Sequence, residues 1–237
     1  MIKEAINKLL YAVFPRRCEL CGDVVAFDKE LCEECESLER ISGELCNKCG
    51  KPKDECECKK HSNNKKPEYK AFIAPYYYEG SIRAGAVRFK EYGFPELSVR
   101  MGKEMYAHIA NYYCDIPFDI ITFVPMTRKK ENKRGFNQSE LLANEIAKHM
   151  EIPVQKLIAK IKSTGQQKRL GARQRRVNLR GSFDLENGAQ VKDKTVLLVD
   201  DIRTTGSTLN ECAYVLNSYG AKAVYAVAFC MAKAKDK

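Results

Sequence analysis

The sequence lacks any long apolar run. Crossing a bilayer takes about 18 consecutive apolar residues, and the longest candidate, residues 223–232, is only about half as long and is typical of a buried strand. The first residues do not resemble a signal peptide, because Lys3, Glu4 and Lys8 interrupt a pattern of apolar residues at helical spacing. We therefore expect a cytoplasmic protein that begins with an amphipathic helix and does not insert into a membrane.

Histidine is scarce, with three residues in the chain. His61 lies in a polar stretch, and His108 and His149 lie on faces of expected helices. We expect solvated or packing roles for them rather than catalysis.

Cysteine, in contrast, is concentrated near the N-terminus. Eight of the eleven cysteines form four close pairs: Cys18 and Cys21, Cys32 and Cys35, Cys46 and Cys49, and Cys56 and Cys58. A secreted disulfide scaffold is not expected without an export signal, and a redox pair would stand alone. Two thiolates on a tight turn can bind one tetrahedral ion, so four pairs predict two structural Zn²⁺ sites. Sequential pairing is the simpler arrangement, and an interleaved one stays open.

The polar segment 59–67, which ends at a proline, predicts a linker. We expect a first domain over residues 1–66, with the amphipathic helix and a zinc ribbon, and a second over residues 67–237. In the second, apolar strands (72–78, 119–125, 196–199 and 223–229) alternate with helices (from Ser81, 95–112, 137–150 and 208–218). This alternation predicts an α/β fold with a doubly wound, mostly parallel sheet. Because it has its own sheet, we expect this domain to keep its fold without zinc.

The segment from Val196 to Thr208 carries the strongest sign of chemistry. An apolar strand leads into Asp200 and Asp201, and a small-residue loop then opens a helix. Ligands of open parallel sheets bind at this edge, and a helix N-terminus with exposed N–H groups suits a phosphate. The loop residues are Thr204, Thr205, Gly206, Ser207 and Thr208. A carboxylate pair beside a phosphate loop fits a 5-phosphoribosyl group, although such a pair could also bind Mg²⁺ in a phosphotransfer site.

Two further stretches complete a family pattern. One runs from Val124 and Pro125 into Arg134, Gly135, Phe136, Asn137, Gln138 and Ser139; the other, from Lys162 to Phe183, contains Gln167, Leu170, Arg175 and Asn178. With the cysteine pairs and the Asp-Asp segment, the chain resembles the ComF/ComFC family, which is associated with bacterial competence. That resemblance implies a double zinc ribbon followed by a type I phosphoribosyltransferase-like domain that binds 5-phosphoribosyl 1-pyrophosphate (PRPP) with Mg²⁺.

The resemblance also implies roles for individual residues. Asp200 and Asp201 would bind the ribose hydroxyls, and the loop from Thr204 to Thr208 the 5-phosphate. Met126, Thr127, Arg128 and Lys129 would form the pyrophosphate loop, and residues 163–181, including Gln167, Arg175 and Asn178, a flexible loop over the site. Lys130 stands where the family often has arginine, which keeps the charge but not the bidentate fork.

Basic charge is concentrated around these motifs. Residues 123–181 have a net charge of +11, while the whole chain has +10. Such a field attracts a polyanion, either PRPP or single-stranded DNA, for which Phe136, Tyr112 and Tyr113 would offer stacking faces. Two functions therefore remain: phosphoribosyl transfer to an unidentified acceptor, or a PRPP sensor or single-stranded-DNA-binding factor that works with the DNA-uptake machinery.

Overall fold

The computed structural model describes residues 11, 13–58, 66–161 and 182–233. Its centre is a parallel sheet in the order β1-β7-β6-β3, with β2 also paired to β7. The strands are β1 (Phe72–Ile73), β2 (Tyr76–Tyr77), β3 (Ile120–Phe123), β6 (Thr195–Arg203) and β7 (Ala223–Met231). All carboxyl ends of these strands therefore lie along one edge of the sheet.

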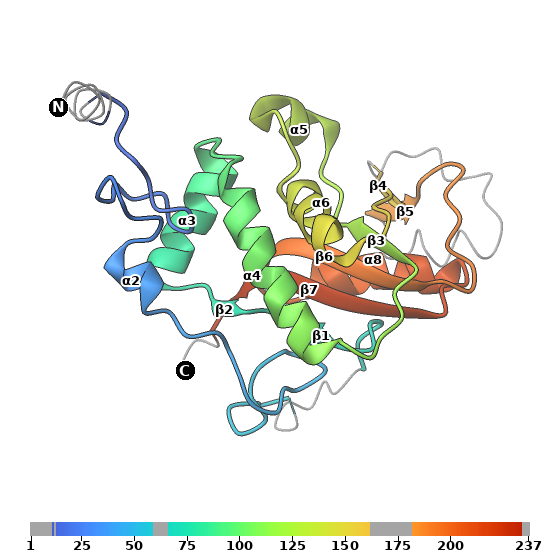
Figure 1. Cartoon of the computed structure of the whole chain (residues 1–237). Coiled ribbons are helices and arrows are strands. Elements are labelled where there is room, and N and C mark those ends of the chain that lie inside the picture. The colour runs from blue at the N-terminus through green and yellow to red at the C-terminus, as the bar shows by residue number, and fades with distance from the viewer. Residues whose placement is uncertain (1–10, 12, 59–65, 162–181, 234–237) are drawn as a thin grey trace.

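Both faces of the sheet are buried, as its apolar strands require. On one face, Leu197 and Val199 pack with α3 (Gly80–Glu91), α4 (Leu97–Tyr112) and α6 (Gln138–Met150). On the other, Val196 and Leu198 pack with α8 (Ser207–Ser218). Figure 1 shows α4 and α6 side by side on their face of the sheet. The predicted doubly wound α/β fold is confirmed.

Several boundaries differ from the expectation. The predicted strand 72–78 is divided into β1 and β2 by a break at Ala74 and Pro75, and α3 begins one residue before Ser81. The antiparallel hairpin of β4 (Ile158–Lys160) and β5 (Phe183–Leu185) was not predicted.

The short helix α5 (Arg128–Arg134) was not predicted either. Its boundaries nevertheless have ordinary causes. The Thr127 side chain caps its first turn by accepting from the Lys130 N–H, and Gly135 ends it with a φ of 83° that favours glycine.

The N-terminal cysteine segments, which include the short helix α2 (Glu33–Glu36), pack directly on the second part of the chain. Cys18, Leu20 and Cys21 share one apolar core with Phe89 and Met101. Gly85 allows this approach, because a Cβ there would lie 2.2 Å from the Leu20 carbonyl oxygen. The predicted domain boundary near residue 66 therefore separates two segments that share a core.

The cysteine segments also border the β1–β2 edge of the sheet. The Ile41 N–H donates to the Pro75 carbonyl at 2.7 Å, and the Phe72 N–H donates to the Asn47 carbonyl at 3.0 Å.

Among the described residues, no helix combines the length and the apolar character needed to span a bilayer.

Candidate functional site

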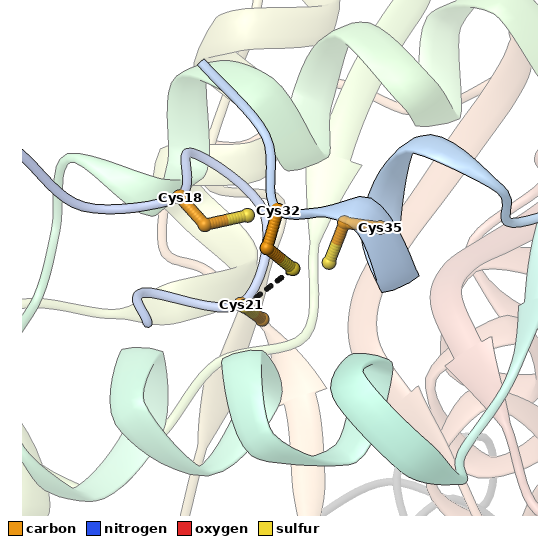
Figure 2. A group of neighbouring side chains, drawn as sticks. All are labelled: Cys18, Cys21, Cys32 and Cys35. Carbon is orange, nitrogen blue, oxygen red and sulfur yellow. Dashed lines mark hydrogen bonds between the residues drawn. The ribbon is translucent and has the colours of Figure 1, made fainter. Parts of the chain in front are cut away.

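The first four cysteines converge on one point. The sulfur atoms of Cys18, Cys21, Cys32 and Cys35 all lie within 4.8 Å of one another. Figure 2 shows the four side chains directed toward a common centre above α3, with Cys21 Sγ and Cys32 Sγ 3.7 Å apart. The turn between the first two cysteines is closed by Gly22, whose φ is 79° and whose N–H donates to the Cys18 carbonyl at 2.8 Å.

The second four cysteines repeat this arrangement. Cys46, Cys49, Cys56 and Cys58 also have their sulfur atoms within 4.8 Å of one another, and Cys49 Sγ lies 3.6 Å from Cys56 Sγ. Gly50 closes the turn as Gly22 does, with a φ of 77° and an N–H bond to the Cys46 carbonyl at 2.8 Å. The sequential pairing of the cysteines is confirmed.

Both clusters fit zinc. With Zn–S bonds of about 2.3 Å, tetrahedral geometry places two ligand sulfurs about 3.8 Å apart, which matches both measured pairs. Four sulfurs complete the coordination of each ion and leave no position for a substrate. Zinc would therefore hold these turns together rather than take part in chemistry.

A cavity of 330 Å³ lies at the carboxyl edge of the sheet. Predicted site residues from three parts of the chain line it: Asp200, Asp201, Thr204 and Thr208; Met126 and Thr127; and Arg134, Asn137 and Gln138. The other predicted residues in the described part of the chain do not line it: Arg128, Lys129, Gly135, Phe136, Thr205, Gly206 and Ser207. Gln167, Arg175 and Asn178 lie outside the described residues.

The two carboxylates differ in their surroundings. Both belong to β6, which continues beyond the predicted apolar segment to Arg203. Asp200 is buried, and its Oδ1 accepts from Ser139 Oγ at 3.0 Å and from the Asp201 N–H at 2.9 Å. Burial raises the pKa of Asp200 well above its usual range, and the adjacent Asp201 carboxylate adds to this. Asp201 is more exposed, and its Oδ1 accepts from the Ile202 N–H at 2.7 Å.

The hydroxyl loop after β6 turns sharply into α8. Gly206 precedes the helix with a φ of 80°, a conformation that side-chain-bearing residues rarely adopt. Thr205 and Ser207 hydroxyls lie 2.9 Å apart, so they engage each other at the turn. Thr204 and Thr208 line the cavity from the two sides of this turn.

The segment from Thr127 to Ser139 forms part of the cavity wall, and its side chains bond to neighbouring elements. Asn137 caps α6 by accepting from the Ser139 N–H at 3.1 Å, and its amide donates to the Val124 carbonyl at 3.1 Å. The Arg134 guanidinium pairs with Glu91 at 2.9 Å and donates to Gln138 Oε1 at 3.3 Å. Contacts with backbone and with neighbouring side chains therefore fix the polar wall of the cavity.

Three lining residues lie outside every predicted motif: Tyr78, Lys90 and Lys160. They come from the end of β2, from α3 and from β4, and no motif marks them. Ser139 also lines the cavity; it stands in the predicted motif, but its bond to Asp200 joins residues 61 positions apart.

The aromatic rings predicted to stack on bases are largely covered by other side chains of the protein. Tyr113 is 5% exposed and donates from its hydroxyl to the Ala226 carbonyl. The Phe136 ring stacks on Phe89 at a centroid distance of 5.9 Å, and Tyr112 lies against His108. The expectation that Tyr113 offers a face to a base is wrong, because its apolar neighbours enclose the ring.

Comparison with known families matches two segments of the chain. A double zinc ribbon domain model matches residues 9–63, and a phosphoribosyl transferase domain model matches residues 137–237. Competence protein F of Haemophilus influenzae is 35% identical over 103 residues, 43% of this chain and 45% of the relative. With both domain models and this relative in place, the predicted resemblance to ComF/ComFC proteins is confirmed. The chain combines a double zinc ribbon domain with a phosphoribosyl transferase domain and is similar to competence proteins F and ComFC.

Two other relatives agree with this assignment. DNA utilization protein YhgH of Escherichia coli is 35% identical over 113 residues, 47% of this chain and 49% of the relative. Competence protein ComFC of Bacillus subtilis is 26% identical over 145 residues, 61% of this chain and 57% of the relative. The chain thus spans about half the length of the curated relatives it matches. Both cysteine clusters lie within the match to the double zinc ribbon model, and Asp200, Asp201, Thr204 and Thr208 lie within the match to the phosphoribosyl transferase model.

Proposed function

We propose that the protein binds Mg-PRPP in the 330 Å³ cavity and transfers its 5-phosphoribosyl group to a nitrogen nucleophile, releasing pyrophosphate. One observation carries this proposal. The carboxylates of β6, the threonines of the loop after it and the cationic segment after β3 all line a single cavity. Each suits one part of PRPP: the diol, the 5-phosphate and the pyrophosphate.

The ribose end would be held by β6 and its loop. Asp200 and Asp201 offer carboxyl oxygens to the two ribose hydroxyls as hydrogen-bond acceptors. The Ser139 hydroxyl holds Asp200 Oδ1 in place, and so fixes the orientation of that carboxylate. Thr204 and Thr208 offer hydroxyls to the 5-phosphate.

The leaving group, pyrophosphate, would be held by cationic side chains that line the cavity. Lys130 and Arg134 line the cavity from α5, and Lys90 and Lys160 line it from α3 and β4. Positive charge develops at ribose C1 during the transfer, so the reaction needs no covalent nucleophile. Preorganised cations favour the departure of pyrophosphate because they stabilise its negative charge. The carboxylate pair also suits the Mg²⁺ that the substrate carries, which would neutralise phosphate charge.

Buried thiols do not offer an alternative nucleophile. Cys212 and Cys230 are both fully buried. Burial raises the pKa of each thiol well above its usual range, so both stay protonated near neutral pH. This supports a mechanism by positioning and electrostatics.

The test is pyrophosphate release. The protein should be incubated with Mg-PRPP and a panel of bases, nucleotides and single-stranded DNA, and PRPP binding should be followed by calorimetry. We expect saturable PRPP binding with competition by ribose 5-phosphate, and pyrophosphate release with one acceptor class. Binding without release for any acceptor would favour the PRPP-sensor function, and absence of binding would exclude both.

The exposed basic surface of α5 favours a second function, the handling of single-stranded DNA during uptake. Arg128, Lys129, Lys130 and Lys133 are all exposed, and α5 has no buried residue. Relatives named for competence and DNA utilization support this function. Lys168, which would contribute further charge, lies outside the described residues.

Charge reversal on α5 tests DNA binding. Replacing Lys133 with Glu should weaken single-stranded DNA and flatten the salt dependence, since each phosphate contact contributes a slope of about −0.7 log units per log salt. PRPP affinity should stay unchanged, because Lys133 does not line the cavity. The control is Lys192→Glu, the same charge change at an exposed residue near the start of β6, the opposite edge of the sheet. Equal salt slopes for the two variants, or no binding by the wild type, would contradict this function.

A further inference from the structure

Arg203 is the last residue of β6 and contacts both β1 and the second cysteine cluster. Its guanidinium lies over the Phe72 ring, 4.8 Å from the centroid, and donates to the Cys49 carbonyl at 3.4 Å. Cys49 belongs to the second cysteine cluster, and the two residues are 154 positions apart. The strand that carries the carboxylate pair therefore ends on a turn that would hold zinc.

The hydroxyl loop rests on the same side chain. A Cβ at Gly206 would lie 2.8 Å from Arg203 Nε and 3.0 Å from Nη2, so the loop backbone packs directly against the guanidinium. Arg203 Nε is buried and has no hydrogen-bond partner among the described residues. The position of the loop thus depends on where this guanidinium lies.

The zinc turn is fixed to the same place from its other side. A Cβ at Gly50 would lie 2.7 Å from Phe72 Cδ1, and the Phe72 N–H donates to the Asn47 carbonyl at 3.0 Å. The Tyr69 hydroxyl donates to the Lys48 carbonyl at 2.9 Å. Residues 47–50 are therefore held against β1, and the Phe72 ring lies close to both Gly50 and the Arg203 guanidinium.

We propose that Arg203 is a positioning residue that couples zinc retention in the second cluster to phosphate binding by the loop from Thr204 to Thr208. The inference rests on the proposed function of that loop. With zinc bound, the Cys49 carbonyl and Phe72 hold the guanidinium under Gly206 and keep the loop in its binding conformation. Coupling between two sites is reciprocal in binding free energy, so a phosphate ligand in the loop must raise the zinc affinity of the second cluster, and we expect zinc to be lost more slowly.

The first cluster supplies a matched comparison. Arg88 of α3 donates to the carbonyl of Cys21, the counterpart of Cys49, and pairs with Asp23 at 2.6 Å. Arg88 does not line the cavity, and no contact joins it to the loop in the described part of the chain. Zinc in the first cluster should therefore be insensitive to a ligand in the loop.

The experiment measures zinc release to a chromogenic chelator with and without saturating ribose 5-phosphate. The variants are Arg203→Met and Arg88→Met, each loaded with zinc and checked by elemental analysis. Ribose 5-phosphate should slow one of the two release phases about tenfold in the wild type, a typical magnitude for coupled sites. Arg88→Met should accelerate the other phase and keep the protection, which assigns the phases. Arg203→Met should abolish the protection.

The outcomes separate the inference from the function on which it rests. If calorimetry shows ribose 5-phosphate binding but neither phase is slowed, or both are slowed equally, the coupling is overturned and the function stands. If the wild type does not bind ribose 5-phosphate, both fall. Should Arg203→Met fail to hold zinc, Arg203→Lys keeps the charge without the planar face. Full protection in that variant would overturn the role of the guanidinium.

Discussion

Replacing Cys18 with serine should unfold much more than the zinc ribbon. We expect the zinc content to fall from about two ions per chain to about one, and the free energy of unfolding of the whole chain to fall by more than about 3 kcal/mol, since structural zinc contributes about 10–16 kcal/mol to such modules. The reason is the shared core, in which Cys18 and Leu20 pack with Phe89 and Met101. In addition, Glu34 Oε1 accepts from the Ser81 N–H in the first turn of α3.

Elemental analysis and denaturation followed by circular dichroism check this prediction. The control is Cys114→Ser, because Cys114 is exposed and belongs to neither cluster. That variant should keep both ions and the wild-type transition. A Cys18→Ser protein that loses one ion yet shows an unchanged unfolding midpoint for α3 and the sheet would restore the expectation, made from the sequence, that the second domain folds alone.

Replacing Asp200 and Asp201 together with asparagine should weaken PRPP by at least about tenfold. Loss of one charged hydrogen-bond acceptor costs about 1.5–3 kcal/mol, and about 1.4 kcal/mol corresponds to a factor of ten. Asparagine keeps an oxygen for the Ser139 hydroxyl, so the cavity wall should hold its shape. Calorimetry with PRPP measures the loss. The control is Asp193→Asn, an exposed residue before β6 whose φ of 60° asparagine tolerates.

The pH dependence of stability separates lost binding from lost folding. Because the pKa of Asp200 is raised in the folded protein, the folded state retains a proton that the unfolded state releases, and stability falls as the pH rises above the unfolded pKa. The double variant removes this loss. Its melting temperature at neutral pH should equal or exceed that of the wild type, and a marked fall would show that lost folding, not lost hydrogen bonds, explains the weaker binding.

Much of this structure could be predicted where the information is local. The Asn137 cap, the four cysteine pairs and the strand that leads into Asp200 each depend on residues within a few positions of one another. The cavity lining from Lys90 and Lys160 could not be predicted, because surface lysines have no distinctive spacing and meet the site only through the fold.

The shared core and the Arg203 contact were missed for a related reason. A composition change at residues 59–67 indicates where a chain runs through solvent, but it does not show whether the segments on either side pack together. The bonds from Arg88 to Cys21 and from Arg203 to Cys49 span 67 and 154 positions. Such contacts follow from tertiary packing and leave no pattern in a single sequence.

The hydrogen bonds from Ile41 to Pro75 and from Phe72 to Asn47 have a consequence for solubility. An edge strand presents unpaired backbone groups on which a strand from another molecule can assemble, and this is a common start of aggregation. At the β1–β2 edge, some of these groups are already bonded to the segment between and around the cysteine clusters. A chain deprived of zinc would expose this edge, so shortage of the metal should lead to self-association of the protein as well as to lower stability.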